Sequence, residues 1–276
     1  MIKKYFFTNQ LKYIFIAITG IFLAACSNEP SAQKDSSLLT RIENKGTITV
    51  GTEGTYAPFT YHDESGKLTG YDVEVVRLVA EKLGVKVEFK ETNWDSMLAG
   101  LKSGRFDMVA NQVALNNPER QATFDKSEPY SYSGPMILNR VGDNRISSLS
   151  DIKGLKSAQT LSSQYGELAR KNDAEVVPVD GMAQALELVK QNRADFTFND
   201  SLALLDYLKK NPNSGLKVAW RSSGETGKIL GAGITVNKGN KEALDKISQA
   251  IVELKKEGKL KELGIKFFGA DISTSK

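Results

Sequence analysis

Five side chains in this sequence have the types and the spacing to hold a small zwitterion. Arg120 can bind a carboxylate through two parallel hydrogen bonds, a geometry that lysine cannot reproduce. Ser163 precedes a predicted helix, where free backbone N–H groups and the helix dipole favour an anion. Asp200 can accept hydrogen bonds from an ammonium group, and Tyr56 and Trp94 can enclose an apolar or sulfur-bearing portion of a ligand. Together these groups suit a free α-amino acid.

Other polar side chains stand beside these five at the ends of predicted strands. The runs at 52–59 (TEGTYAPF), 93–95 (NWD), 111–114 (NQVA) and 160–164 (TLSSQ) each begin near the end of a strand. Ligands of open α/β sheets bind at the carboxyl ends of the strands. We therefore expect the site to be lined by Glu53, Tyr56, Trp94, Asn111, Gln112, Val113, Ala114, Arg120, Ser162, Ser163 and Asp200.

Each of these residues also has a purely structural explanation. Arg120 would pair with a surface acid, Asp200 or Ser163 would cap a helix, and Tyr56 and Trp94 would pack in a core. Ser162 would likewise be a cap, and Glu53 would cap a turn. Their joint placement at strand ends favours a binding site over these alternatives.

Hydrophobic periodicity predicts the strands and helices that must position this site. Apolar or alternating runs predict strands at 47–51, 85–91, 108–110, 136–141, 157–160, 175–179, 196–199 and 229–236. Helical spacing of apolar residues predicts helices at 71–83, 96–103, 165–172, 182–189, 201–208 and 243–254. Met182 belongs to such an apolar stripe and is expected to pack in a core. Strands separated by helices predict an α/β fold with mainly parallel sheets covered on both faces.

The order of these elements predicts two lobes. It recurs around 47–110 and 136–199, and the segment 130–135 (YSYSGP) suits a crossover between the two halves. The last strand and helix are expected to return to the first half, which gives two crossovers and a hinge. We expect lobe 1 to comprise residues 39–133 and 229–276, and lobe 2 to comprise residues 134–228.

The amino terminus has the pattern of an export signal. Three lysines precede a short apolar run that is too short to span a bilayer, and residues 23–26 (LAAC) resemble the lipobox of bacterial lipoproteins. We expect residues 1–25 to be a signal peptide, Cys26 to carry the lipid and residues 26–38 to be a flexible tether. The alternative is a buried free cysteine behind an ordinary cleavage site. The expected product is a membrane-anchored lipoprotein that faces the periplasm or the cell exterior.

Composition excludes several classes of function. The chain of 276 residues carries a formal charge of +4, but residues 1–25 hold three lysines and no acid, so the remainder carries only +1. No general electrostatic attraction to nucleic acid is therefore expected. One cysteine and one histidine, His62, exclude a disulfide scaffold and any metal site built from several His or Cys ligands. Neither a metal nor a cofactor is expected.

Four longer runs carry a resemblance to a known family. The runs 52–59, 68–84 (LTGYDVEVVRLVAEKLG), 89–109 (FKETNWDSMLAGLKSGRFDMV) and 119–134 resemble the family-3 solute-binding proteins of bacterial amino-acid ABC transporters, in that family's motif order. The resemblance implies a type II periplasmic-binding-protein-like fold with a two-strand hinge. It also implies an amino-acid ligand, an ABC permease as partner, and a monomer. In the family, Arg120 and Ser163 fall on contacts to the α-carboxylate, and Asp200 falls on the contact to the α-ammonium.

The same comparison assigns further roles. Tyr56 and Trp94 fall on the family's aromatic clamp, and Glu53 falls where many relatives have an acid that helps choose the ligand side chain. The runs at 111–113, 130–135 and 194–208 are most similar to the cystine-binding branch, so cystine is the expected ligand and another polar amino acid the alternative. Two departures are an alanine at 114 where relatives have Ser or Thr, and a longer loop before Arg120.

Two other classes of function compete with transport. One is an enzyme on the same fold, a periplasmic dehydratase with Glu53 or Asp200 as general acid or base. The fold offers no cysteine nucleophile and no Ser/His/acid arrangement, so no enzyme is expected. The other is a ligand sensor or adhesin that uses the cleft only to signal.

Overall fold

The computed structural model describes residues 37–115, 117–222 and 231–275. The expected signal peptide, Cys26 and nearly all of the expected tether lie outside the described residues. The start of the strand expected at 229–236 lies outside them as well. In the three described ranges, no helix has both the length and the apolar character that crossing a membrane requires.

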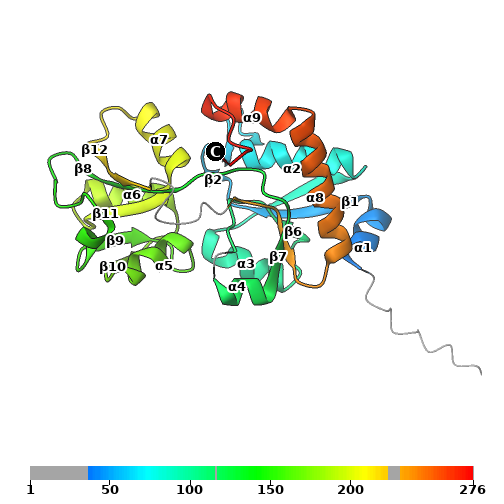
Figure 1. Ribbon diagram of the computed structural model, residues 1–276, viewed down its shortest axis with the longest axis horizontal. Helices are drawn as coiled ribbons and strands as arrows, with labels where there is room; N and C mark the ends of the chain where they lie inside the picture. Colours follow the sequence, from blue (N-terminus) through cyan, green and yellow to red (C-terminus); the bar gives the residue numbers. More distant parts are fainter. Residues whose placement is uncertain (1–36, 116, 223–230, 276) are drawn as a thin grey trace, which may run out of the picture. The chain divides into compact units, whose positions relative to one another are not determined.

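The first sheet has five strands in the order β5-β1-β6-β13-β7 (Figure 1). Its strands are β1 (Thr47–Thr52), β5 (Lys86–Glu91), β6 (Met108–Val109), β7 (Phe124–Lys126) and β13 (Thr235–Asn237). β1 pairs in parallel with β5, from Thr47 opposite Lys86 to Thr52 opposite Glu91. Ile48 and Val50 are fully buried in β1, which makes this strand the centre of the first core.

Helices cover this sheet and contribute most of its apolar side chains. They are α1 (Leu38–Lys45), α2 (Tyr71–Lys82), α3 (Trp94–Lys102), α4 (Pro118–Thr123), α8 (Lys241–Lys256) and α9 (Lys259–Phe268). Val75 and Val79 from α2 pack with Ile247 and Ile251 from α8 in one cluster of buried residues. The side chain of Asn93 accepts a hydrogen bond from the backbone N–H of Ser96 at 3.0 Å and so caps α3.

The second sheet also has five strands, in the order β10-β9-β11-β8-β12. Its strands are β8 (Pro135–Arg140), β9 (Lys156–Gln159), β10 (Glu175–Pro178), β11 (Phe196–Asp200) and β12 (Leu216–Arg221). The helices packed with it are the 3₁₀ turn η1 (Leu149–Ile152), α5 (Gln164–Lys171), α6 (Met182–Lys190) and α7 (Ser201–Lys210). A smaller sheet of β2 (Thr55–Tyr56), β3 (Thr60–His62) and β4 (Leu68–Thr69) follows β1.

Two chain segments connect the two five-stranded sheets. The first leads from β7 to β8, and the second leads from β12 back to β13. The two segments meet at an antiparallel bridge, where the Ala232 N–H donates to the Ser131 carbonyl at 2.9 Å and the Tyr130 N–H donates to the Ala232 carbonyl at 2.8 Å. This pairing is the two-strand connection that hinge architecture requires.

Both large sheets are mainly parallel, as the sequence pattern predicts, and each contains one reversed strand. In the first sheet β13 pairs antiparallel with β6 and β7, and in the second sheet β8 pairs antiparallel with β11 and β12. The reversed strands, β8 and β13, are those that enter a sheet from a connecting segment. A strand that arrives from the other half of the molecule has no helical crossover to return it in the parallel direction.

A close approach between β1 and α3 fixes the start of the first sheet's binding edge. The ring of Phe106 lies so near the backbone that a Cβ at Gly51 would sit 2.7 Å from it, and a Cβ at Gly100 would sit 2.6 Å from it. Phe106 is itself buried. Glycine at both positions therefore lets α3 pack directly on β1, which brings Trp94 toward the residues that follow Thr52.

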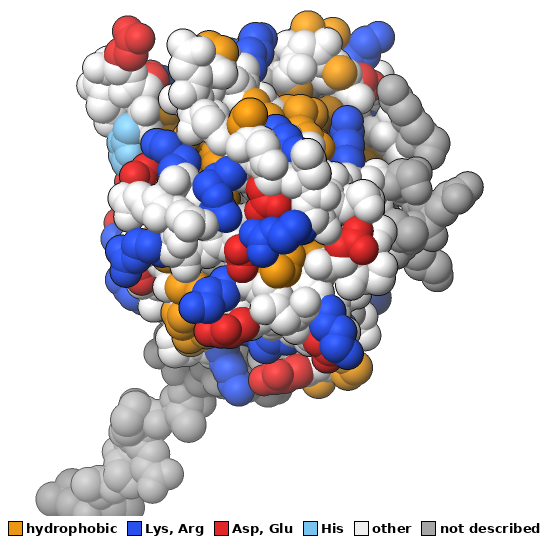
Figure 2. Space-filling model, turned by 90° about the vertical axis from the view of Figure 1, so that its left-hand side faces the viewer, with side chains coloured by type: hydrophobic (Ala, Val, Ile, Leu, Met, Phe, Trp, Pro, Cys, Tyr) orange, Lys and Arg blue, Asp and Glu red, His pale blue; other side chains and the backbone are white. Residues whose placement is uncertain are grey.

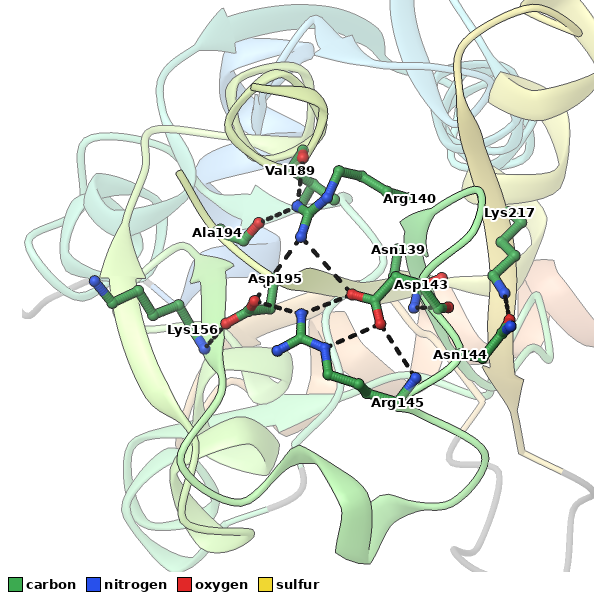
Figure 3. A network of polar contacts seen from close by, with 10 residues as sticks. All are labelled: Asn139, Arg140, Asp143, Asn144, Arg145, Lys156, Val189, Ala194, Asp195 and Lys217. Atoms are coloured by element: carbon green, nitrogen blue, oxygen red, sulfur yellow. Dashed lines mark hydrogen bonds and ion pairs between the residues drawn. The ribbon is translucent and has the colours of Figure 1, made fainter. Parts of the chain in front are cut away.

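A network of four charged side chains closes the end of the second sheet that is remote from the carboxyl ends of β9 and β11 (Figure 3). Arg145 Nη2 lies 2.7 Å from both Asp143 and Asp195, and Asp195 accepts from the N–H of Lys156 at 2.8 Å. Arg140 donates to the carbonyl groups of Val189 and Ala194. The hydrogen bonds from Arg145 hold the pKa of Asp143 at about 2.

Charged side chains of both signs are interspersed on the face of the molecule that Figure 2 shows. Lysine and arginine side chains there lie next to aspartate and glutamate side chains, and apolar side chains gather toward the top of that view. Opposite charges at this spacing cancel each other's field beyond a Debye length, so this face has no single-sign patch to attract a polyion.

Candidate functional site

A cavity of about 50 Å³ lies at the carboxyl ends of strands from both large sheets. From the first sheet and its helices it is lined by Glu53, Tyr56, Trp94, Asn111 and Gln112. From the second sheet and its helices it is lined by Thr160, Ser163, Gln164, Tyr165, Gly181, Met182 and Asn199. Its position agrees with the rule for ligand sites in α/β folds. We refer to it as the cleft cavity.

Glu53 is the ionisable carboxyl group of the cleft cavity. Its side chain accepts a hydrogen bond from Asn111 Nδ2 at 2.5 Å, and its N–H donates to Asn111 Oδ1 at 2.8 Å. Burial raises the pKa of Glu53 to about 7, and the bond from Asn111 offsets part of that rise. A carboxyl group with this pKa is half ionised at neutral pH, and a neighbouring cation would favour its charged form.

Aromatic side chains form two walls of the cleft cavity. The Tyr56 hydroxyl donates to Asn199 Oδ1 at 2.6 Å, so this wall joins the residues after β1 to the end of β11. Burial raises the pKa of Tyr56 well above its usual value, and the charge of Asp200 adds to that rise. Trp94 stands on α3, and its indole N–H is buried without a hydrogen-bond partner among the described residues. An unpaired buried donor is free to bind an oxygen of a ligand.

Gln112 is held in an uncommon backbone conformation by a buried acid. Its φ is 52°, and its N–H and Nε2 donate to the two carboxylate oxygens of Asp72 at 2.9 and 2.6 Å. Its Oε1 accepts from the Ser131 hydroxyl at 3.0 Å, in one of the two connecting segments. Burial raises the pKa of Asp72 to about 7. Asp72 therefore fixes a wall of the cavity and was not among the residues that sequence reasoning singled out.

Val113 and Ala114 are buried on the first-sheet side and do not line the cleft cavity. Val113 packs in a cluster with Met97, Leu101 and Phe106. The carbonyl of Ala114 accepts a hydrogen bond from Arg120 Nη1 at 3.0 Å. Val113 and Ala114 thus serve the site through their backbone, which leads from β6 toward Arg120 and gives its guanidinium a carbonyl partner.

Arg120 lies in a short helix rather than at the end of a loop. Asn117 caps α4 by accepting from the Arg120 N–H at 2.9 Å, and Pro118 occupies the first turn. The guanidinium donates to the carbonyl groups of Ala114 and Ser162 and stands 5.7 Å from the centre of the Trp94 ring. It is buried, which lowers its pKa, and it borders an outer groove that meets the cleft cavity at Ser163.

The two serines of the run 160–164 have different partners. Ser163 caps α5, because its hydroxyl accepts from the Gly166 N–H at 3.0 Å while donating to the Thr160 carbonyl at 3.0 Å. It lines both the cleft cavity and the outer groove. Ser162 lines only the groove among these two spaces, and its polar groups contact Asp95 and Arg120.

Asp200 stands behind the wall of the cleft cavity. Its Oδ1 accepts from the Leu202 N–H at 2.8 Å, which caps α7, and its Oδ2 accepts from the hydroxyl of Ser133. Burial raises its pKa to about 6. In the described part of the chain Asp200 borders neither the cavity nor the outer groove. Its negative charge contributes to the raised pKa of Tyr56 and of Tyr165, which do line the cavity.

The cavity thus brings together six of the eleven expected residues, namely Glu53, Tyr56, Trp94, Asn111, Gln112 and Ser163. Arg120 and Ser162 line the adjoining groove, and Asp200, Val113 and Ala114 stand behind these surfaces. The expectation that Met182 packs only in a core was incomplete, since it also lines the cavity. Asn199 and Tyr165 follow the same strand-end pattern as the expected residues and could have been found by it.

Comparisons with known proteins give one consistent family. A family model described as bacterial extracellular solute-binding proteins, family 3, matches residues 48–270. The chain is 50% identical over 233 residues to a probable amino-acid ABC transporter-binding protein of Haemophilus influenzae, covering 84% of this chain and 89% of that protein. It is 46% identical over 271 residues to the L-cystine-binding protein TcyA of Bacillus subtilis, covering 96% of this chain and 99% of that protein.

A solved structure extends this similarity to three dimensions. The L-cystine solute receptor of Neisseria gonorrhoeae, in its unliganded open conformation, is 65% identical in sequence. The match covers 87% of this chain and 100% of that one, with a TM-score of 0.59. The similarity therefore includes both large sheets and the segments that connect them.

Proposed function

The chain belongs to the bacterial extracellular solute-binding proteins, family 3, and from this membership we propose that it captures a free amino acid, L-cystine, and delivers it to an ABC permease. The observation that carries the proposal is the cleft cavity, which has aromatic walls, a titratable carboxyl group and polar groups from both sheets. Arg120 borders the adjoining outer groove, and Asp200, at the end of β11, is buried behind the cavity wall. The names of the relatives support cystine over other polar amino acids.

L-cystine matches this chemistry at both ends and in the middle. One carboxylate would replace the Ser162 carbonyl as the partner of the Arg120 guanidinium, because a charged acceptor binds arginine more strongly than a neutral one. The ammonium of the same end would pair with Asp200. The disulfide would lie between Tyr56 and Trp94, and the second ammonium would pair with Glu53 and hold it in its charged form.

The mechanism that follows is capture by closure of two lobes, comprising residues 39–133 with 229–276, and residues 134–228. Lobe 1 would supply Arg120, the aromatic walls and Glu53, and lobe 2 would supply Ser163 and Asp200. A ligand that contacts both lobes stabilises the closed form, because its charges are fully paired only there. The paired segments at Ser131 and Ala232 would be the hinge. The closed form would then dock on the permease.

Anchoring is part of the same proposal. Lysines followed by a short apolar run and the LAAC sequence at 23–26 support removal of residues 1–25 and lipidation of Cys26. Acyl chains contribute about 0.8 kcal/mol for each buried CH₂ group, so a multiply acylated cysteine would hold the protein on the outer side of a membrane. The expected tether, residues 26–38, of which Leu38 already belongs to α1, would give the folded part its freedom to reach the permease.

A thermal-shift screen of the full chain, in detergent, against the twenty amino acids and L-cystine tests this function. We expect L-cystine at a hundredfold excess over its Kd to raise the Tm by about 5–10 °C, because a ligand that binds only the folded state stabilises it. Cystamine, which lacks both carboxylates, is the matched control and should give no shift.

Two outcomes of the screen would contradict the proposal. If none of the 21 compounds raises the Tm, the chain is no amino-acid receptor. If mass spectrometry of the recovered ligand shows conversion to a product in excess of the protein, the cavity belongs to an enzyme with Glu53 as acid or base. Recovery of unchanged ligand in equal amount to the protein supports binding alone.

A further inference from the structure

One residue of the second half makes all of its polar contacts with the first half. The N–H of Ser162 donates to Asp95 Oδ1 at 2.8 Å, and its hydroxyl donates to the same oxygen at 2.6 Å. The N–H of Leu161 donates to Asp95 Oδ2 at 3.2 Å, and the Ser162 carbonyl accepts from Arg120. The loop that precedes α5 therefore donates hydrogen bonds to the carboxylate of Asp95 and accepts one from the guanidinium of Arg120.

Asp95 makes this contact from outside the cleft cavity. It is exposed, it borders the outer groove, and it is not among the residues that line the cavity. It occupies the second position of α3, where the helix dipole favours a negative charge, and Asn93 caps the same helix. The carboxylate is thus held in place by its own helix, and on its other side it accepts three hydrogen bonds from the facing loop.

We propose that Asp95 is a positioning residue that holds the loop 160–163 against α3 and thereby sets the lifetime of the closed cleft. This inference rests on the proposed function for its consequence but not for its geometry. The loop carries Thr160 and Ser163, which line the cleft cavity, so releasing it opens one wall. A contact present only in the closed form slows opening and leaves the encounter with ligand unchanged, because the encounter occurs with the open form.

The contact between Asp95 and the loop 160–163 is expected to change the ratio of closed to open forms only moderately, because it is exposed to water. Hydrogen bonds to an ionised carboxylate are stronger than neutral ones, and exposure reduces their net effect. Three such bonds correspond to roughly a five- to tenfold change in the ratio of closed to open forms. That factor should appear almost entirely in the rate of ligand dissociation.

The test compares Asp95→Ala with Glu242→Ala in the full chain. Glu242 is also an exposed acid in the first turn of a first-sheet helix, α8, so it controls for the loss of a helix-dipole interaction. In the complex with L-cystine, where the closed form predominates, we expect hydrogen exchange at Leu161 and Ser162 to become about five- to tenfold faster in Asp95→Ala and to stay unchanged in Glu242→Ala. With L-cystine, dissociation should quicken by the same factor and association should change less than about twofold.

The outcomes separate this inference from the proposed function. Unchanged exchange at Leu161 and Ser162 in Asp95→Ala would overturn it, and so would faster exchange with an unchanged dissociation rate. If the wild-type chain binds no amino acid, the proposed function fails, and a crystal structure that shows whether Ser162 donates to Asp95 decides on the contact alone. Should Asp95→Ala not fold, Asp95→Asn, which keeps the acceptor oxygen and loses the charge, should give a smaller change in the same direction.

Discussion

Replacing Arg120 with alanine is expected to weaken the binding of L-cystine by at least about thirtyfold. The guanidinium is buried and already donates to two carbonyl groups, so it is positioned to exchange one of them for a carboxylate without reorganising. Removing one partner of a buried, hydrogen-bonded charge pair costs on the order of 2–5 kcal/mol, which is roughly a thirtyfold to several-thousandfold loss of affinity. Isothermal titration calorimetry on the full chain measures this loss.

Arg120→Lys is the matched control for that variant. Lysine keeps the charge but cannot make two parallel hydrogen bonds to a carboxylate, so we expect an intermediate loss of affinity. If Arg120→Ala binds L-cystine as tightly as the wild-type chain, the arginine only joins Ala114 to Ser162 and has no role in recognition. Melting temperatures of both variants will show whether that structural role has been lost as well.

Replacing Asp200 with asparagine should separate its two roles. Asparagine is as good a helix N-cap as aspartate, so its Oδ1 keeps the cap on α7, while its Nδ2 can donate to the Ser133 hydroxyl, which then acts as the acceptor. The negative charge is lost, and an ammonium in the dry cleft would then have no counterion. We expect the Tm of the ligand-free chain to stay within a few degrees and the affinity for L-cystine to fall by on the order of 2–5 kcal/mol.

Asp200→Ala completes this experiment. It removes the charge and the cap together, so its Tm should fall by an amount that corresponds to about 1 kcal/mol, while its affinity should fall as in Asp200→Asn. A wild-type affinity in Asp200→Asn would mean that the residue acts as a cap alone. That result would leave Glu53 as the acid for the ammonium group.

The sequence predicted the residues at strand ends better than it predicted their partners. Glu53, Tyr56 and Asn111 follow short apolar strands, and strands of one sheet end at one edge, so their convergence follows from topology. The bond between Arg120 and Ser162 joins side chain and backbone across the two halves of the molecule. No local pattern encodes such a contact, because it depends on how far the halves are closed.

Some elements were missed although a signal was present. Asn117 and Pro118 are the cap and first-turn residues of α4, and together they are a recognised start signal for a helix. β12 (LKVAWR) was missed although four of its six residues are apolar, and only Leu216 among them is buried. The strands β8 and β13 were expected, but their reversed direction was not predicted, because the connecting segments set it and not the residues of the strands.

Asp72 shows why a buried acid is hard to recognise in a sequence. It begins α2 beside Tyr71, where an acid is typical of a first helical turn and would ordinarily be solvated. Here both of its oxygens bind Gln112, and the helix turns it into the protein. Asp72 stabilises the left-handed backbone conformation of Gln112, and that conformation is visible only in the folded chain.

A crystal structure of the chain with L-cystine bound tests the central claim most directly. We predict that one carboxylate of the ligand lies within hydrogen-bond distance of Arg120 and that the ammonium of the same end lies within that distance of Asp200. The disulfide should lie between Tyr56 and Trp94. A complex in which Arg120 still donates to the Ser162 carbonyl while the ligand binds elsewhere would contradict the account.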